Sequence, residues 1–415
     1  MNRSFEKISH LSRSNNLHVY NAFKYTYCYL NLIAIWPLLF QNYNLKKIFT
    51  IIHVSVIIFV LVWQIVFRCY HIYLYVIDLD DQVTLLGPML FILVSLLKYL
   101  SLLYRGNFIT KSIKHIYTDW SITQCQEQKD IMIKKAEIST KITSIFSVIM
   151  YAGGLFYNFI MPHVIPLIFK SDDQKTSERL IIFPGYNIIR IFGLSPFYEI
   201  TYFFYIIATL SCYTVLVGIC NLLVFLLSHA DSQIDIVTVQ FNSLIKDVKF
   251  SYAKMSTIIR THDRVLQYSN KILKNVLSEI CLVEIAATTI LLCISEFSSL
   301  RVRKELIFLH RKKFLAEYRS ILFFKYKIFT SALSTNFFYK NPQKFIEVGN
   351  QLYMTEWYRI PSKARRYFIF IINMSQRPQR ISAGGIIDLS YITYIQIIKT
   401  GFAYLQILRA SNTHQ

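Results

Sequence analysis

The sequence predicts an all-α integral membrane protein with seven transmembrane helices, a cytoplasmic N-terminus and an extracellular C-terminus. Composition is the first reason: hydrophobic residues make up 54% of the 415 residues, aromatic residues 16%, and the mean hydropathy is +0.37, above an ordinary soluble domain. The second reason is a series of long stretches with almost no charge. The third is the uneven distribution of basic residues among the connections. We interpret residues 1–415 as a single membrane unit without an appended domain.

Six stretches are apolar over about 20 residues or more, the length that a helix needs to cross the hydrocarbon core. These predicted spans are 48–67, 82–104, 142–169, 191–228, 280–297 and 389–409. An acid within a span is costly unless it reaches water or finds a partner. We therefore expect Glu199 to lie near the outer boundary, and Glu284 either to snorkel or to pair with a basic neighbour, with Lys399 as the candidate. The apolar segment 25–40 is short and contains Pro37, so we expect an interfacial or partly embedded helix there.

The region before the last span departs from this pattern. Residues 301–327 carry nine Lys or Arg against two acids, and the longest uncharged run, 328–339, has twelve residues. Hydropathy therefore gives little support to a sixth span at 303–338. Counting only the well-supported spans gives six crossings and a cytoplasmic C-terminus, whereas including 303–338 gives seven and an extracellular one.

Basic residues are concentrated in alternate connections. Lys and Arg outnumber Asp and Glu by six to one in 1–47, by seven to four in 105–141 and by eight to three in 336–388, whereas 68–81 has one base against three acids. Positive residues favour the cytoplasmic side of a membrane protein, so the N-terminus is predicted to lie inside. Because the aromatic residues lie in the spans, the net charge of +21 does not indicate nucleic-acid binding.

The motifs of common enzymes and metalloproteins are missing from the sequence. It contains no CxxC pair, HExxH, GxGxxG, Walker loop or GxSxG, each of which positions side chains for metal binding, phosphate binding or catalysis. With seven cysteines and ten scattered histidines, we expect no disulfide framework, no metal site, no cofactor and no enzymatic activity. His262-Asp263-Arg264 is similar to the Asp-Arg-Tyr of G-protein-coupled receptors, but it lies within a loop and Val265 follows.

The last span carries a polar stripe. At 100° per residue, Ser390, Thr393, Gln396, Thr400 and Tyr404 fall within about 120° of one helical face. A hydroxyl or amide in hydrocarbon needs a partner. The stripe therefore either packs against other helices or lines water, and the pattern alone leaves both interpretations open.

The C-terminal tail combines several short motifs. They are Trp357-Tyr358, a basic amphipathic segment at 363–372, Gln376-Arg377-Pro378, Ala383-Gly384 and, in the last span, Leu389-Ser390, Thr393-Tyr394, Ile397, Lys399-Thr400 and Tyr404. In this order they resemble the C-terminus of the insect odorant receptors. Residues 258–294 resemble that family's helix with a central His before the fifth span, and Ile35-Trp36-Pro37 is similar to its Gly-Leu-Trp-Pro element. The basic region near 303–340 departs from the family's sixth span.

The resemblance implies a subunit of an odorant-gated, non-selective cation channel. Such receptors form hetero-tetramers with a shared co-receptor in the plasma membrane of olfactory neuron dendrites, and their last helices surround the pore. The second cytoplasmic loop, about 229–273, is short, which is typical of a tuning subunit. The implied partners are a volatile odorant, the co-receptor and the lipid bilayer.

A small apolar volatile offers few hydrogen bonds, so its affinity must come from burial in an aromatic, largely dry pocket. With the N-terminus inside, the outer halves of the second, third and fourth spans supply such side chains. The candidate ligand-binding residues are Met89, Phe91, Phe156, Tyr157, Phe197, Tyr198 and Tyr202. Each of them also fits a role in packing or in an interfacial aromatic belt.

The polar stripe supplies the candidate pore. The pore-lining residues that we expect are Thr393, Gln396, Thr400, Tyr404 and Ile407. The first four would offer dipoles to a hydrated cation. Ile407, further toward the exterior, would form a hydrophobic constriction that gates by dewetting.

Two other functions were compared with this interpretation. A gustatory-type chemoreceptor usually has Thr-Tyr, five apolar residues and then Gln in its last helix, whereas Thr400 occupies that position here. A small-solute transporter would show repeated halves with paired broken helices, and the sequence shows none.

Overall fold

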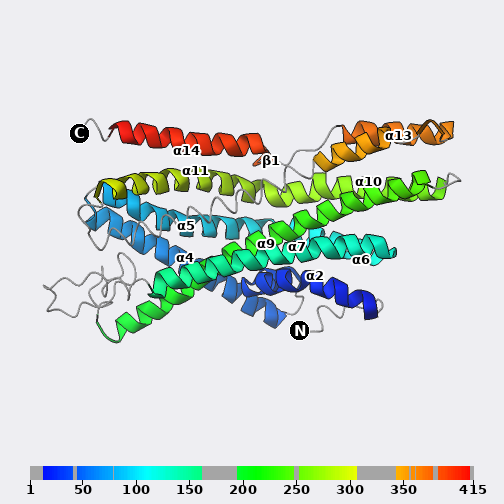
Figure 1. Ribbon diagram of the computed structural model, residues 1–415. Helices are drawn as coiled ribbons and strands as arrows, with labels where there is room; N and C mark the ends of the chain where they lie inside the picture. Colours follow the sequence, from blue (N-terminus) through cyan, green and yellow to red (C-terminus); the bar gives the residue numbers. More distant parts are fainter. Residues whose placement is uncertain are drawn as a thin grey trace.

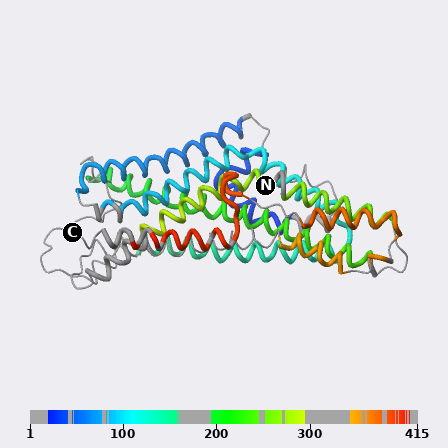
Figure 2. Tube along the Cα trace, turned by 90° about the horizontal axis from the view of Figure 1, so that it is seen from above, coloured from blue at the N-terminus to red at the C-terminus, as the bar shows by residue number. Residues whose placement is uncertain are grey.

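The computed structural model describes residues 13–40, 44–77, 79–160, 194–246, 252–305, 343–354, 357–359, 361–376 and 382–411. Long helices run along one axis and give the molecule an elongated outline (Figure 1). Both views place α10 and α13 at one end and the C-terminal part of α14 toward the other (Figure 2). The charge pattern of the sequence assigns the first of these ends to the cytoplasm, and we call it the cytoplasmic end.

The helices follow the predicted order of spans. The N-terminal half contains α2 (Arg13–Leu32), α3 (Ile35–Phe40), α4 (Asn44–Tyr75), α5 (Leu79–Tyr104), α6 (Gly106–Ile122), α7 (Gln126–Leu155) and the π-helical turn η1 (Phe156–Ile160). The C-terminal half contains α9 (Phe197–Lys246), α10 (Tyr252–Gln267), the π-helical turn η3 (Tyr268–Leu273), α11 (Lys274–Glu305), a helix at 343–353, the 3-10 turn η4 (Trp357–Arg359), α13 (Ser362–Ser375), the strands β1 (Ser382–Ala383) and β2 (Ile387–Asp388), and α14 (Tyr391–Ser411).

Five of these helices are long and apolar enough to cross a membrane: 47–75, 85–104, 126–155, 197–244 and 274–294. They confirm the all-α membrane fold class. In the region proposed for the sixth span, residues 303–305 complete α11 and the remainder lies outside the described residues. The segment 25–40 forms two helices, the end of α2 and α3, which meet at Ala34 with a φ of 59°.

Helix α9 lies at the centre of the bundle. Within the most apolar 18-residue segment of α9, 83% of the residues are buried. The helix packs against α2, α4, α5, α7 and α10. A helix that is apolar around its whole circumference is typical of a buried span. Beyond residue 228, where the sequence places the end of the span, α9 continues to Lys246 at the cytoplasmic end.

A second, separate core fills the cytoplasmic end. Apolar side chains from the end of α9, from α10, from helix 343–353 and from α13 pack together there, with Phe241 and Phe368 in edge-to-face contact at 6.1 Å. The chain then turns through the β1–β2 hairpin, where Gly384 and Gly385 have φ of 61° and 74°, a region that favours glycine. The Gly384 amide donates to the Ser278 carbonyl of α11 at 2.9 Å, so the hairpin fixes the start of α14 against α11.

Close packing of α7 on α9 depends on Gly154. A Cβ atom at this position would lie 2.1 Å from the ring of Tyr213, whereas a Cβ at the adjacent Gly153 would meet nothing within 4 Å. We expect Gly154→Ala to destabilise the bundle by about 1–3 kcal/mol, the usual cost of overpacking. Thermal unfolding of the purified protein should show a lower melting temperature for Gly154→Ala than for the matched control Gly153→Ala. Equal melting temperatures would contradict this packing.

Candidate ligand-binding and pore sites

A buried polar contact joins η1 to α9 in the half of the bundle away from the cytoplasmic end. The Asn158 amide donates to the hydroxyl of Tyr213 at 3.0 Å and to the Gly154 carbonyl at 2.7 Å, and its Oδ1 accepts from the Tyr205 hydroxyl at 2.5 Å. All three side chains are less than a tenth exposed. Asn158 is held by a π-helical turn, a local widening that is frequent at functional sites. This contact therefore places one amide and two phenol groups among apolar side chains.

Aromatic rings surround this contact. Phe91 of α5 meets the Tyr213 ring at 6.2 Å. On the other side, Tyr205 is packed by Trp63 and Phe67 of α4 together with Tyr198 and Tyr202. The rings of Tyr198 and Tyr202 are parallel, with centroids 6.4 Å apart. Asn158, which is hydrogen-bonded to both Tyr205 and Tyr213, joins the two groups of rings. We call the whole set the outer aromatic cluster, and it has few but well-placed hydrogen-bonding groups.

The predicted ligand-binding residues divide between this cluster and its surroundings. Phe91, Tyr198 and Tyr202 belong to the cluster. Met89 lies at the α4 interface, where the Cys69 thiol approaches its sulfur at 3.4 Å. Phe156 and Phe197 are exposed. The side chain of Tyr157 lies outside the described residues.

Sequence reasoning missed Asn158, Tyr205 and Tyr213. Asn158 is the one amide side chain within the uncharged stretch 142–169. A buried amide in a span needs partners, and this requirement was the available signal. Tyr205 and Tyr213 look like ordinary aromatic residues of a span, and only the packing of α7 on α9 brings them to the amide.

A groove of about 490 Å³ follows the outer side of α4. It is lined by Ser55, Ile58, Phe59, Val62, Trp63 and Val66, all from this helix. Trp63 belongs both to the groove and to the outer aromatic cluster. The exposed apolar residues of α4 form the surface that a bilayer would cover.

Helix α14 begins with a capped turn. The Ser390 hydroxyl accepts from the Thr393 amide at 3.2 Å, and the Thr393 hydroxyl donates to the Asp388 carbonyl at 2.7 Å. Such contacts satisfy amides at the start of a helix. The Thr393 hydroxyl is therefore already bonded at the end of the predicted stripe.

The next two residues of the stripe remain uncovered. Gln396 and Thr400 are exposed, and the Thr400 hydroxyl donates to the Gln396 carbonyl at 2.8 Å. Among the described elements, α14 packs chiefly on α11. The contact face contains Gly401, where a Cβ atom would lie 2.1 Å from Leu292. The side chains of Tyr404 and Ile407 lie outside the described residues.

Comparison with known proteins identifies the family. The family model for the 7tm odorant receptors matches residues 78–402. The chain belongs to the odorant receptor family. Two solved structures have the same fold: the insect olfactory receptor OR5 from Machilis hrabei in complex with eugenol, at a TM-score of 0.73 and 12% identity, and the same receptor in a second structure, at 0.72 and 13%. Each comparison covers 94% of this chain and 98% of the other. No curated protein sequence matches the chain.

A buried ion pair lies in the membrane half of the receptor. The Lys98 ammonium of α5 donates to the Glu284 carboxylate of α11, and both residues are at least nine-tenths buried. The expected pairing of Glu284 with Lys399 is wrong, because Lys399 is exposed on α14. Sequence spacing cannot select between two lysines that lie on different helices. Glu199 is exposed and accepts from the Ser195 hydroxyl at 3.0 Å.

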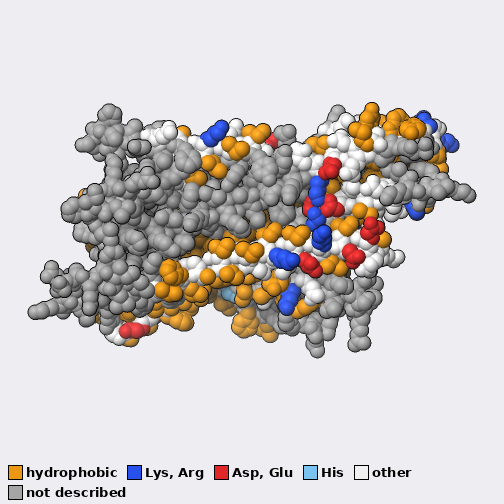
Figure 3. Space-filling model, viewed as in Figure 1, with side chains coloured by type: hydrophobic (Ala, Val, Ile, Leu, Met, Phe, Trp, Pro, Cys, Tyr) orange, Lys and Arg blue, Asp and Glu red, His pale blue; other side chains and the backbone are white. Residues whose placement is uncertain are grey.

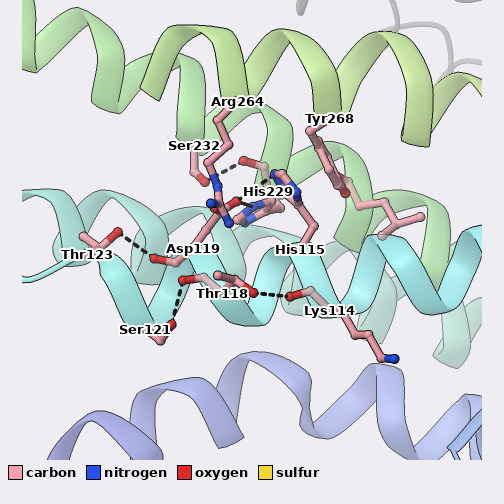
Figure 4. Close-up of polar contacts among 11 residues, drawn as sticks. Lys114, His115, Thr118, Asp119, Ser121, Thr123, His229, Ser232, Arg264 and Tyr268 are labelled. Carbon is pink, nitrogen blue, oxygen red and sulfur yellow. Dashed lines mark hydrogen bonds and ion pairs between the residues drawn. The ribbon is translucent and has the colours of Figure 1, made fainter. Parts of the chain in front are cut away.

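Asp119 is the centre of a polar cluster at the cytoplasmic end of the receptor (Figure 4). Its carboxylate accepts from Arg264 of α10 and contacts His229 of α9 at 3.0 Å and His115 of α6 at 3.4 Å. Burial raises the pKa of Asp119, but the His229 hydrogen bond and the charges of both histidines and Arg264 outweigh it and hold the pKa below its ordinary value. Burial lowers the pKa of His115. The Tyr268 ring stacks on His115 at 5.0 Å.

A second ionic cluster at the cytoplasmic end joins α7, α9 and helix 343–353. Lys135 of α7 and Lys344 of helix 343–353 both contact Asp231 and Asp235 of α9. On the face shown in Figure 3, acidic and basic side chains gather toward this end of the receptor, and the described side chains of the other half are mostly apolar. Within the described part of the chain, no group of three His, Cys, Asp or Glu residues has an arrangement that would hold a metal ion.

His262, two residues before Arg264 in the sequence, points into the cytoplasmic core. It is 2% exposed and its ring meets Phe345 edge-on at 6.3 Å. Burial lowers the pKa of His262 from the ordinary 6.5 to about 4, against a small opposing effect of Asp263. The folded protein therefore binds this proton less readily than the unfolded chain does.

The sign of the resulting pH dependence follows from linkage. The stabilisation from neutral His262 is fully present above pH 6.5 and is lost as the pH falls from 6.5 toward 4, by up to about 1.4 kcal/mol per pH unit. We expect the melting temperature of the purified receptor to fall over this range, and to fall less steeply in His262→Phe, which keeps an aromatic ring. Equal slopes in the two proteins would contradict this role for His262.

Proposed function

We propose that this receptor is the tuning subunit of an odorant-gated, non-selective cation channel. The observation that carries the proposal is the exposed polar face of α14, with Gln396 and Thr400. Such a face is costly against lipid. Neighbouring subunits around an aqueous pore would place it beside water instead.

The outer aromatic cluster is the proposed odorant site. Eugenol, bound in the Machilis receptor, is a volatile phenol that combines an aromatic ring with few hydrogen-bonding groups. The cluster offers this chemistry: apolar rings for burial and the Asn158 amide with two phenols for orientation. Ligand contacts would come from Phe91, Tyr198 and Tyr202, with Met89, Phe156, Tyr157 and Phe197 at its margins.

The pore follows from the position of α14. Gln396 and Thr400, with Thr393 and Tyr404, would line it and offer dipoles to a hydrated cation, and Ile407 would form the hydrophobic gate. One α14 helix cannot enclose a pore, so several subunits must each contribute one. We infer that the complex is a hetero-tetramer with a shared co-receptor in the plasma membrane of olfactory neuron dendrites.

The odorant acts by shifting the balance between closed and open forms. It can shift gating only by its differential affinity for the two. The outer aromatic cluster must therefore have a different shape in the two forms, which its position between α4, α5, η1 and α9 allows.

The proposal is tested by recording currents from cells that co-express this chain with an insect odorant receptor co-receptor. A panel of volatile phenols, alcohols and esters that includes eugenol should contain members that evoke an inward current. Because the pore is non-selective, replacing sodium with potassium should leave the reversal potential nearly unchanged. Co-receptor expressed alone is the control.

Phe91→Ala, which removes one ring of the cluster, should raise the half-maximal odorant concentration by about tenfold or more, because an aromatic contact and its burial are lost. Currents that arise equally without this chain would contradict the proposal.

A further inference from the structure

The Lys98–Glu284 ion pair lies between the proposed odorant site, which is the outer aromatic cluster, and the proposed pore helix α14. Lys98 lies on α5, two helical turns from Phe91 in the outer aromatic cluster. Between them, the Ser95 hydroxyl accepts from the Cys212 thiol of α9 at 3.1 Å. The part of α5 that leads from the cluster to Lys98 is therefore in direct contact with α9, the helix that carries Tyr205 and Tyr213.

On the other side of the pair, α11 is fixed to the pore helix at two levels. At one level, the Ser278 carbonyl of α11 accepts from the Gly384 amide of the hairpin that precedes α14. At the other, Leu292 packs on Gly401 of α14 so closely that a Cβ atom there would overlap it. Glu284 lies on α11 between these two attachments. A displacement of α11 near Glu284 would therefore be passed to α14.

The pair is also the kind of contact that resists separation. Both residues are buried within membrane-spanning helices, and removing one partner would leave a charge in a dry environment. A buried charge pair thus fixes α5 against α11 at one defined pair of side chains, and separating these charges costs more than separating a single apolar contact. In membranes, buried ionisable residues are in general associated with function.

We propose that Lys98 and Glu284 are positioning residues that couple odorant binding at α5 to movement of the pore helix α14 through α11. The inference rests on the proposed function and adds the route by which odorant binding reaches the pore helix. Odorant displaces α5, the ion pair carries α11 with it, and the two attachments of α11 move α14.

The chain provides a matched control. Arg105, at the cytoplasmic end of α5, donates to Glu279 of the same α11, but these side chains are 23% and 34% exposed. This pair is partly exposed, so water screens it more than it screens the buried pair, and its loss should cost less. It joins α5 to α11 without lying between the two sites, so coupling should not depend on it.

The experiment uses the full-length chain co-expressed with the co-receptor and the most potent volatile of the panel. The variants are Lys98→Met, Glu284→Gln, the double neutral variant with both changes, the charge swap Lys98→Glu with Glu284→Lys, and the control Arg105→Met with Glu279→Gln. Half-maximal concentration and maximal current are measured, and the latter is divided by the amount of receptor labelled at the cell surface.

Each single variant removes one member of the buried ion pair and keeps the charge of the other, so surface receptor should fall to a small fraction of wild type. The double neutral variant has no unpaired charge and should recover surface receptor, yet its half-maximal concentration should remain about tenfold or more above wild type, within the range typical of coupling between sites. The charge swap and the Arg105/Glu279 control should stay within about threefold of wild type.

A double neutral variant with wild-type sensitivity would overturn the proposal, since the pair would then serve stability alone. A charge swap as insensitive as the double neutral variant would also overturn it. Equal surface levels in the single and double variants would show that the pair is not formed. A wild-type receptor that stays silent to the whole panel contradicts the proposed function instead, while the surface levels still test the pair.

Discussion

The architecture depends on the burial of one helix, α9, where nearly every residue from 212 to 237 is buried. A buried helix leaves its polar side chains without water, so neighbouring elements must supply partners. Asn221 donates a hydrogen bond to Thr143 of α7, and His229 contacts Asp119 of α6. Asp231 forms ion pairs with a lysine of α7 and a lysine of helix 343–353. Each contact fixes a different element against α9. Polar contacts therefore act in both halves: those of Asn221 lie in the membrane half, and those of His229 and Asp231 lie at the cytoplasmic end beside its apolar core.

The outer aromatic cluster and the pore helix are separated in space but connected through few elements. Helix α5 contributes to the cluster and, deeper in the bundle, is joined to α11. Helix α11 in turn packs on α14 and holds the hairpin before it. In the mechanism that we propose, the binding of a small molecule moves the pore helix because rigid helices share a small number of strong contacts, and packed interiors transmit displacement.

Much of the fold was predictable because the bilayer restricts what a spanning sequence can be. The stretch 48–67 is apolar because lipid allows little else, and it lies within α4. Asp119, His229 and Asp231 lie in stretches that the sequence assigns to connections between spans, since it gives no sign that α9 continues into a second core. The predicted partner of Glu284 was wrong for a related reason. The neighbour of a buried charge depends on which helices pack together, and hydropathy does not contain that information. Asn158 was missed because one amide scarcely alters the average of a long apolar stretch.

The central claim is that α14 borders water on the face of Gln396 and Thr400, and cysteine accessibility tests it most directly. Single cysteines at these two positions, and at the half-buried Ile397 as control, are treated with a charged thiol reagent in the assembled complex while an active volatile is present. The account predicts rapid modification and an altered current at 396 and 400, and little effect at 397. Cysteines at 396 and 400 that remain unmodified in a stimulated, conducting complex would contradict it.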